Sequence, residues 1–400
     1  MQSLAQTSSA DRPASSEGAP YGNGTLPAGI RSRLLPGLNG LTVHVLEAGF
    51  EPGDRPLVLL LHGFPELAYS WRKIMLPLAQ AGFHVAAADQ RGYGRTTGWD
   101  PAYDASPHPF GFLNVVTDTV SLAAALGRKQ VACVVGHDAG SPAAAWCALL
   151  RPDVFRSVVM MSAPFAGPPA LPVSAGGTAA PSPAQSDDAL DAQLAALPRP
   201  RKFYQRWYRT REANHDMLHA PQGLRDFLRA YYHTKSADWT ANDPHPLASR
   251  SAGDFAQLPT YYVMDRDKGM AATVAVEMPS ADQVRSCAWL TDAELDVYVS
   301  EYTRTGFQGG LQGYRRYTDA ECVADLRPFA GRTIDVPSSF ISGKSDWGVY
   351  QAPGAAEAMR ARACTNMTGF HLVQGAGHWV QQERPEPVAR LLTEFIRNHA

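Results

Sequence analysis

The chain has 400 residues, 45% of which are hydrophobic, and a formal net charge of −2 at pH 7. This length is enough for one large α/β domain with an inserted second layer, or for two modest domains. A near-neutral chain without a basic run is a poor match for nucleic acid or an anionic membrane surface, so a small neutral substrate fits better. The five cysteines are widely spaced and form no metal-binding pattern, which favours a reducing compartment.

The N-terminal segment, residues 1–27, is rich in Ser, Ala, Gly and Pro and lacks the pattern of a signal peptide. We expect it to be a disordered leader on a cytoplasmic protein. No apolar run approaches the roughly 18 residues that cross a bilayer, so no membrane association is expected. Strand-like apolar runs then alternate with helical or loop-rich segments, which predicts a mostly parallel sheet with helices on both faces. These runs lie at residues 41–46, 57–61, 84–88, 131–135 and 157–161.

The alternation stops after Pro164, and an Ala-, Pro- and Ser-rich stretch is followed by an aromatic, charged segment with helical periodicity. The sheet pattern resumes at residues 337–341 and 370–373, and an amphipathic helix over about 386–398 ends the chain. We therefore expect a mainly helical lid, or cap, inserted into an α/β core above the carboxyl ends of the strands. The expected boundaries are 28–165 and 334–400 for the core and 166–333 for the cap.

The most informative motif is Gly136-His137-Asp138-Ala139-Gly140, which follows an apolar run and precedes an Ala-rich helical segment. A G-x-D-x-G pattern in this place is the nucleophile elbow of the α/β-hydrolase fold, with Asp138 where a serine usually stands. A carboxylate is already charged at neutral pH and needs no base to attack. It can displace oxygen or halide from a saturated carbon and leave an alkyl ester that water cleaves later. The alternative is an Asp that only caps the helix.

Cleavage of such an ester needs a base for water and a group that orients this base. Asp346 lies in the loop after the strand predicted at 337–341, and His378 lies in a glycine-rich loop after the strand predicted at 370–373. The chain order Asp138, Asp346, His378 is the order expected for this fold. Singly, Asp346 and His378 could be ordinary loop residues, but together at strand ends they predict a catalytic triad.

An oxyanion hole is predicted beside Asp138. The strand predicted at 57–61 runs into an H-G-F-P turn whose backbone can point N–H groups inward. We expect the backbone N–H groups of Phe64 and Ala139 to stabilise the tetrahedral intermediate that forms when water attacks the Asp138 ester. The alternative is a turn of purely structural importance. His137 is expected to be a packing residue.

Two other patterns do not predict ligands. Residues 89–94 place glycines after a strand, but prolines lie where a dinucleotide-binding helix would run, so we interpret the segment as a turn in which Asp89 and Arg91 pair locally. His215 and His219 have the i, i+4 spacing of metal ligands without a third ligand in a recognisable frame. We therefore expect no metal and no cofactor.

Taken together, the motifs resemble the α/β-hydrolase-fold epoxide hydrolases, and the resemblance covers the chain from about residue 30 to its end. It implies an ester on the enzyme and a vicinal diol as the product. The motifs that carry it are the H-G-F-P turn, Asp89-x-Arg91-Gly92-x-Gly94, the elbow, the Asp346 loop and Gly377-His378-Trp379.

The resemblance also implies two tyrosines in the lid that protonate the epoxide oxygen, and chemistry requires such donors because an alkoxide leaves poorly unless a proton meets its charge. Segment 305–315 is similar to the family segment with the second tyrosine, which indicates Tyr314. Segment 201–208 is similar to the segment with the first, which indicates Tyr204, with Tyr208 as the alternative. The residues expected to contact the substrate are Phe64, Tyr204, Tyr314 and Trp347.

The lid departs from the family by an apolar, Met-rich insertion at about 260–278, which could line the pocket, pack on the lid or contact a second copy of the chain. The sequence therefore decides neither whether the protein forms a homodimer nor which epoxide it hydrolyses. A dehalogenase would share the triad but would cradle a halide with indole N–H groups, and here Ala139 rather than Trp follows the nucleophile. The other alternative is a non-catalytic binding protein on the same fold. We expect a cofactor-independent hydrolase of apolar or aryl epoxides.

Overall fold

A nine-stranded sheet forms the centre of the computed structural model, which describes residues 16–17, 21, 24–51, 53–171 and 183–399. The strand order is β1-β2-β3-β5-β4-β6-β7-β10-β11, and every pairing from β5 to β11 is parallel. This confirms the predicted α/β-hydrolase fold with a mostly parallel sheet. The strands are β1 (Ser16–Glu17), β2 (Arg31–Leu38), β3 (Leu41–Ala48), β4 (Leu57–Leu61), β5 (His84–Ala88), β6 (Cys133–His137), β7 (Val158–Met161), β10 (Ser338–Gly343) and β11 (Met367–Val373).

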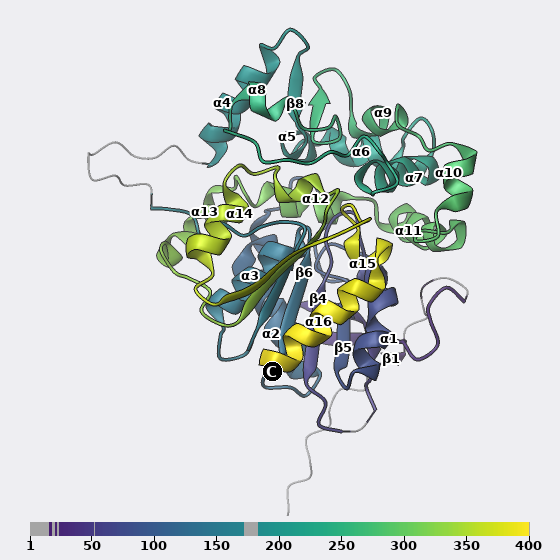
Figure 1. The fold of residues 1–400 in the computed structure, drawn as a ribbon, viewed down its shortest axis with the longest axis vertical. Coiled ribbons are helices and arrows are strands. Elements are labelled where there is room, and N and C mark those ends of the chain that lie inside the picture. Colours follow the sequence, from purple (N-terminus) through teal and green to yellow (C-terminus); the bar gives the residue numbers. More distant parts are fainter. Residues whose placement is uncertain (1–15, 18–20, 22–23, 52, 172–182, 400) are drawn as a thin grey trace, which may run out of the picture.

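Helices cover both faces of this sheet (Figure 1). Helices α1 (Arg72–Gln80), α15 (Val380–Glu383) and α16 (Pro385–His399) share one hydrophobic cluster with the sheet, and α2 (Phe112–Ala125), α3 (Gly140–Leu150) and α14 (Ala355–Ala358) share the other. In α16 the buried residues recur at helical spacing, which turns one apolar stripe toward the strands. They are Val388, Ala389, Leu392, Phe395 and Ile396. The Ala-rich sequence of α3 fits its nearly complete burial against β6 and β7.

The segment between β7 and β10 forms a mainly helical cap above the carboxyl ends of the strands (Figure 1). It also contains an unpredicted antiparallel pair, β8 (Arg201–Phe203) and β9 (Val263–Asp265). The helices are α4 (Pro183–Ala195), α5 (Tyr204–Tyr208), α6 (Glu212–Leu218), α7 (Leu224–Lys235), α8 (Ala252–Phe255), α9 (Met270–Ala275), α10 (Ala281–Ser286), α11 (Asp292–Thr305), α12 (Gln308–Arg315) and α13 (Ala320–Leu326).

Two expectations about the N-terminal half need correction. Tyr21 is fully buried and its hydroxyl donates a hydrogen bond to Asp89, so the predicted disordered leader is wrong at Tyr21; most of 1–27 lies outside the described residues. Asp89 and Arg91 do not pair with each other. Asp89 lies 2.8 Å from a ring nitrogen of His44, whereas Arg91 forms an ion pair of 2.7 Å with Asp118.

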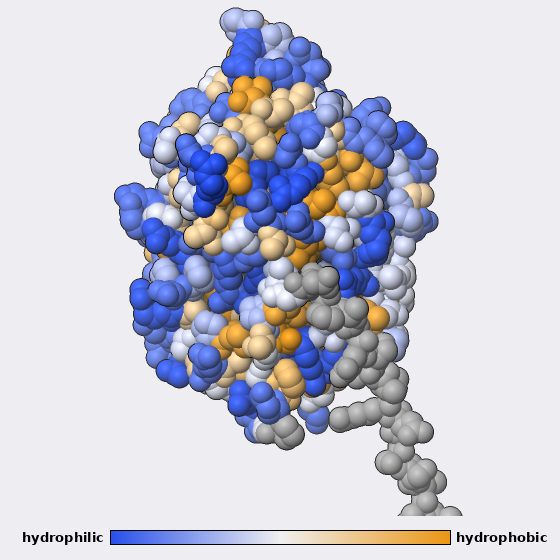
Figure 2. Space-filling view, turned by 90° about the vertical axis from the view of Figure 1, so that its right-hand side faces the viewer, coloured by the Kyte–Doolittle hydropathy of each residue, from blue (hydrophilic) through white to orange (hydrophobic). Residues whose placement is uncertain are grey.

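The surface shows hydrophobic residues scattered among hydrophilic ones rather than gathered into one large patch on the face seen in Figure 2. In the Met-rich insertion, Val276 and Met278 are exposed while Met264 and Met270 are buried. Within the described ranges, no helix combines the length and the apolar character needed to cross a bilayer.

Candidate active site

Asp138 stands at the tip of a sharp turn between β6 and α3. Its φ of +51° lies in the left-handed region, which is strained for a residue with a side chain. The turn requires glycine on both sides, because a Cβ on Gly136 would lie 1.9 Å from the Gly140 carbonyl oxygen and a Cβ on Gly140 would lie 2.2 Å from that of Leu61. The G-x-D-x-G sequence therefore builds an elbow that lifts the Asp138 carboxylate above the sheet edge.

The three predicted triad residues meet at this elbow. His378 Nε2 lies 3.2 Å from Asp138 Oδ2, and His378 Nδ1 lies 3.1 Å from Asp346 Oδ1. Asp346 is fixed in turn by the Gly348 N–H at 2.7 Å and the Ser342 hydroxyl at 2.9 Å, both of which donate to its carboxylate. The three side chains are almost completely buried, so the contacts between their charges are little screened by water.

The protonation states follow from this burial and these contacts. Burial alone would raise the pKa of Asp138, but the hydrogen bond and charge of His378, helped by Lys235, hold it well below its ordinary value. Burial alone would lower the pKa of His378, but the carboxylates of Asp346 and Asp138 raise it to about 9. Asp138 is therefore an ionised carboxylate at neutral pH, and His378 is an imidazolium while both carboxylates are charged.

One of the two predicted backbone N–H groups contacts the nucleophile. The Phe64 N–H donates to Asp138 Oδ1 at 2.9 Å, and the Ala139 N–H has no hydrogen-bond partner among the described residues. Gly63 brings the H-G-F-P turn this close, because a Cβ there would lie 2.3 Å from the Cβ of Asp138. The Phe64 N–H beside the carboxylate, together with an Ala139 N–H that has no other partner in the described ranges, suits a tetrahedral oxyanion at this carbon.

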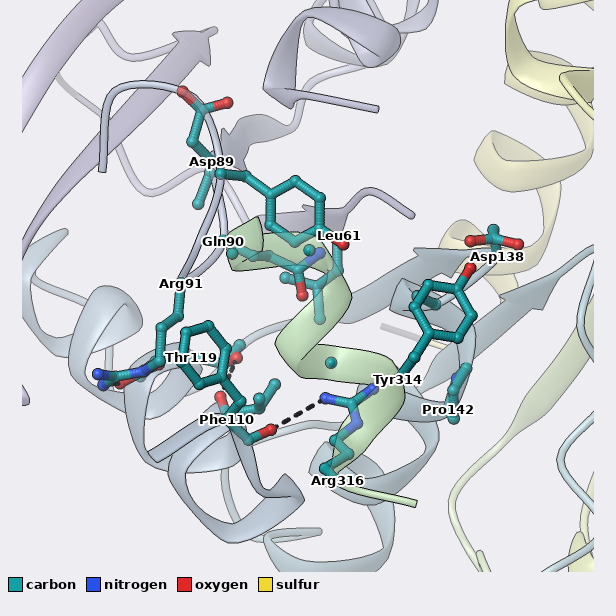
Figure 3. A pocket seen from close by; sticks show the side chains of 18 of the residues that line it. Leu61, Asp89, Gln90, Arg91, Phe110, Thr119, Asp138, Pro142, Tyr314 and Arg316 are labelled. Atoms are coloured by element: carbon teal, nitrogen blue, oxygen red, sulfur yellow. Dashed lines mark hydrogen bonds and ion pairs between the residues drawn. The ribbon is translucent and has the colours of Figure 1, made fainter. Parts of the chain in front are cut away.

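A cavity of about 130 Å³ opens in front of Asp138, and Tyr204 of α5 and Tyr314 of α12 form part of its wall. Figure 3 shows the Tyr314 side chain with its hydroxyl turned toward Asp138. The Tyr204 hydroxyl donates to Gln351 Oε1 at 3.1 Å and accepts from the Gln205 amide at 3.2 Å, and the Tyr314 hydroxyl interacts with that of Tyr204. Burial raises the pKa of both phenols, and the Asp138 charge raises it further, so both are protonated donors at neutral pH.

The structure separates Tyr204 from the alternative, Tyr208. Tyr208 is fully buried, its hydroxyl donates to that of Tyr231 at 3.1 Å, and it is not part of the cavity wall. Two other predicted contacts are also absent from this wall. The Phe64 ring is buried against Tyr208 and Tyr314, and Trp347 packs edge-on against His245. The backbone of Phe64 contacts Asp138, and the predicted substrate contacts of Phe64 and Trp347 stay a prediction.

Several residues near the triad were not foreseen as part of the site. His137 is more than a packing residue: its ring nitrogens contact the Glu66 carboxylate at 2.5 Å and the His378 carbonyl oxygen at 2.7 Å. Gln351 accepts from Tyr204, and Lys235 lies beside the triad. His137 belongs to the elbow motif, whereas Gln351 and Lys235 have no motif and are brought to the site only by the fold. Among the described residues, no group of three or more His, Cys, Asp or Glu side chains is arranged to hold a metal ion.

Comparison with known proteins agrees with this geometry. A family model described as the alpha/beta hydrolase fold matches residues 56–385. Epoxide hydrolase A of Mycobacterium tuberculosis is 34% identical over 382 residues, which cover 92% of this chain and 98% of that protein. Epoxide hydrolase B of the same organism is 32% identical over 364 residues, with 89% and 96% covered.

Solved structures give the same result. The chain is similar to an epoxide hydrolase from an endophytic Streptomyces, with a TM-score of 0.72, 31% sequence identity, and coverage of 93% of this chain and 96% of that one. Epoxide hydrolase A from Mycobacterium thermoresistibile follows with a TM-score of 0.70 and 28% identity, covering 93% and 99%. The chain therefore belongs to the α/β-hydrolase family, among the epoxide hydrolases of that fold.

Proposed function

We propose that the protein hydrolyses apolar or aryl epoxides to vicinal diols through a covalent ester on Asp138. The observation that carries this proposal is the cavity wall, where the ionised carboxylate of Asp138 and the protonated phenols of Tyr204 and Tyr314 share one cavity. A carboxylate attacks carbon, and phenols protonate oxygen, so the arrangement suits an electrophile in which carbon and oxygen are adjacent. The apolar and aromatic residues of the wall suit an apolar substrate. They include Leu41, Val43, Leu61, Phe110, Val115, Leu122 and Pro142.

In the first step an Asp138 carboxylate oxygen forms a bond to an epoxide carbon, and the carbon–oxygen bond of the ring breaks. The electron pair of that bond goes to the ring oxygen, which takes a proton from Tyr204 or Tyr314. The product is a hydroxyalkyl ester of Asp138. The resting hydrogen bonds prepare this step, because the Phe64 N–H holds one carboxylate oxygen and His378 holds the other.

In the second step His378 removes a proton from water, and the hydroxide attacks the carboxyl carbon of the ester. The Phe64 and Ala139 N–H groups stabilise the oxyanion, which then collapses with release of the diol and return of the Asp138 carboxylate. The Asp346 carboxylate orients the imidazole and balances its positive charge. The protons balance because the resting imidazolium of His378 gives its proton to the tyrosinate after ring opening, which leaves the neutral imidazole that activates water. The proton taken from water then restores the imidazolium.

A dehalogenase on this fold would need N–H donors for the halide. The cavity wall contains no tryptophan among the described residues, and its hydroxyl donors suit an oxygen leaving group. The five cysteines are all free thiols, which agrees with a cytoplasmic protein.

The origin of the diol oxygen tests the proposal. A single turnover of styrene oxide in ¹⁸O-water, with enzyme in excess, should leave the label in the peptide that contains Asp138 and give a mostly unlabelled diol. This is because water attacks the carboxyl carbon and the diol takes an oxygen from Asp138. Label in the diol after the first turnover would mean that water attacks the epoxide directly, and it would refute the ester mechanism.

A further inference from the structure

A buried lysine lies beside the triad without an acidic partner of its own. Lys235 is the last residue of α7 and is 3% exposed. Its Nζ lies over four tyrosine rings, at 4.7–5.6 Å from the centroids of Tyr204, Tyr231, Tyr261 and Tyr262. The ammonium itself forms no hydrogen bond or ion pair with another described residue. Cation–π contacts stabilise such an ammonium, but moving it out of water is costly, and an apolar side chain would fill the same space without that cost.

The backbone of Lys235 is attached directly to the loop that carries the catalytic histidine. The His378 N–H donates to the Lys235 carbonyl oxygen at 2.8 Å. The Glu383 carboxylate accepts from the N–H groups of Ala237 and Gly377, at 2.8 and 2.9 Å, and so ties the two loops together. They are in such close contact that a Cβ on Gly377 would lie 2.6 Å from the Lys235 carbonyl oxygen. These contacts hold the backbone of Lys235 against the His378 loop, and the four tyrosine rings surround its ammonium.

The charges around Lys235 and His378 determine how the ammonium affects the protonation of His378. His378 contacts Asp138 and Asp346 and lies against the ring of His137. The groups whose charges act on Lys235 are Asp138, Asp346 and Glu66. In the resting site both carboxylates favour the imidazolium form of His378. Ester formation removes the charge of Asp138, and the next step requires neutral His378.

We propose that the Lys235 ammonium is a positioning charge for the hydrolytic step, because it disfavours the imidazolium form of His378 and makes the neutral base available in the ester. The inference rests on the proposed function. Opposite effects on His378 support it: Asp346 and Asp138 raise its pKa, and Lys235 lowers it. Burial lowers the pKa of Lys235 itself to about 8, while the three carboxylates oppose that shift, so most of the ammonium is charged at pH 7.

The test compares Lys235→Met, which removes the charge and keeps the bulk, with Lys235→Arg, which keeps the charge. Formation and hydrolysis of the styrene oxide ester are measured separately in stopped-flow experiments across a pH series. Lys235→Met should slow ester hydrolysis about tenfold at neutral pH and move the lower limb of its pH profile up by about one unit, since the imidazolium form then persists to higher pH. Ester formation should change less than about threefold, and Lys235→Arg should restore the profile.

Lys202→Met is the matched control. Lys202 is another cap lysine, its ammonium lies 4.1 Å from the ring centroid of Trp207, and it is not among the charges that shift the pKa of His378. It should leave both steps unchanged. Lys235→Gln is made alongside Lys235→Met, and either neutral variant that retains its thermal unfolding transition decides the question. An unshifted hydrolysis profile, or an equal loss in both steps that Lys235→Arg does not restore, would overturn the inference. Absence of any ester in the wild-type protein would instead overturn the proposed function.

Discussion

The two cap tyrosines should contribute unequally to ring opening. Tyr204 and Tyr314 are both assigned as donors to the epoxide oxygen, but a phenol has one proton to donate. In the resting site the Tyr204 proton is donated to Gln351 Oε1 at 3.1 Å, whereas the Tyr314 hydroxyl interacts with the Tyr204 hydroxyl. Tyr204 must therefore break its bond to an amide oxygen outside the pair before it serves the substrate, and Tyr314 gives up only its contact with the other donor. We predict that Tyr314→Phe slows ester formation more than Tyr204→Phe does.

The magnitude follows from the two kinds of hydrogen bond. A hydrogen bond to a developing charge contributes about 1.5–3 kcal/mol, so loss of the Tyr314 hydroxyl should slow ester formation about 10- to 150-fold. The bond to Gln351 is a neutral one, whose net value is about 0.5–1.5 kcal/mol. The penalty for Tyr204→Phe should be smaller than that for Tyr314→Phe by this amount, which is a factor of about 2 to 12. The double variant should form almost no ester.

Single-turnover fluorescence provides the assay, because the Trp379 ring lies 4.7 Å from the ring of His378 and should report ester formation. Tyr208→Phe is the matched control: it removes a buried hydroxyl that bonds to Tyr231 outside the cavity. It should cost about 1 kcal/mol of unfolding free energy and leave ester formation unchanged. The reasoning fails if folded Tyr314→Phe forms the ester at the wild-type rate, or if Tyr208→Phe slows this step as much as Tyr204→Phe does.

Two further substitutions separate the triad from the turn that faces it. His378→Gln should still open the ring and then stall at the ester. The intact protein should gain the mass of one substrate, and turnover should fall at least about 100-fold. Normal turnover without an adduct would remove His378 from the mechanism. Gly63→Ala should slow ester formation and cost about 1–3 kcal/mol of stability, because its Cβ would lie 2.3 Å from the Asp138 Cβ and displace the nucleophile. Gly253→Ala, where the nearest atom is 3.9 Å away, is its control, and equal effects of the two would contradict the steric argument.

Much of the fold was predictable because its strands are buried on both faces and are therefore continuous apolar runs. The predicted runs at 57–61 and 84–88 coincide with β4 and β5. Strand β2 has no such pattern, since Pro36 and Gly37 interrupt it at a register shift. Strands β8 and β9 are too short to show periodicity, and their pairing joins residues more than 50 positions apart.

Within the site, the residues that could be predicted from the sequence are those whose backbone conformation depends on their immediate neighbours in the chain. Asp138 lies between two glycines whose close contacts permit the elbow, so its motif can be read from a short stretch of sequence. Lys235, Glu66 and Gln351 occupy ordinary helix or loop sequences and acquire their positions from tertiary contacts. Conversely, a residue next to a catalytic one in the sequence can lie outside the cavity wall. Trp347 follows Asp346 directly, but the 3₁₀ turn that begins at Trp347 points its ring toward His245.

The Met-rich insertion at about 260–278 contacts both Tyr204, a predicted site residue, and Lys235, which was not predicted. The Tyr204 N–H donates to the Tyr262 carbonyl oxygen at 2.8 Å, and the β8–β9 pairing ends immediately before Tyr204. The rings of Tyr261 and Tyr262, from the same segment, contribute two of the four faces around the Lys235 ammonium. One segment thus fixes the backbone of a ring-opening donor and surrounds the charge assigned to ester hydrolysis. Changes in this insertion should therefore alter the balance of the two chemical steps as well as the choice of substrate.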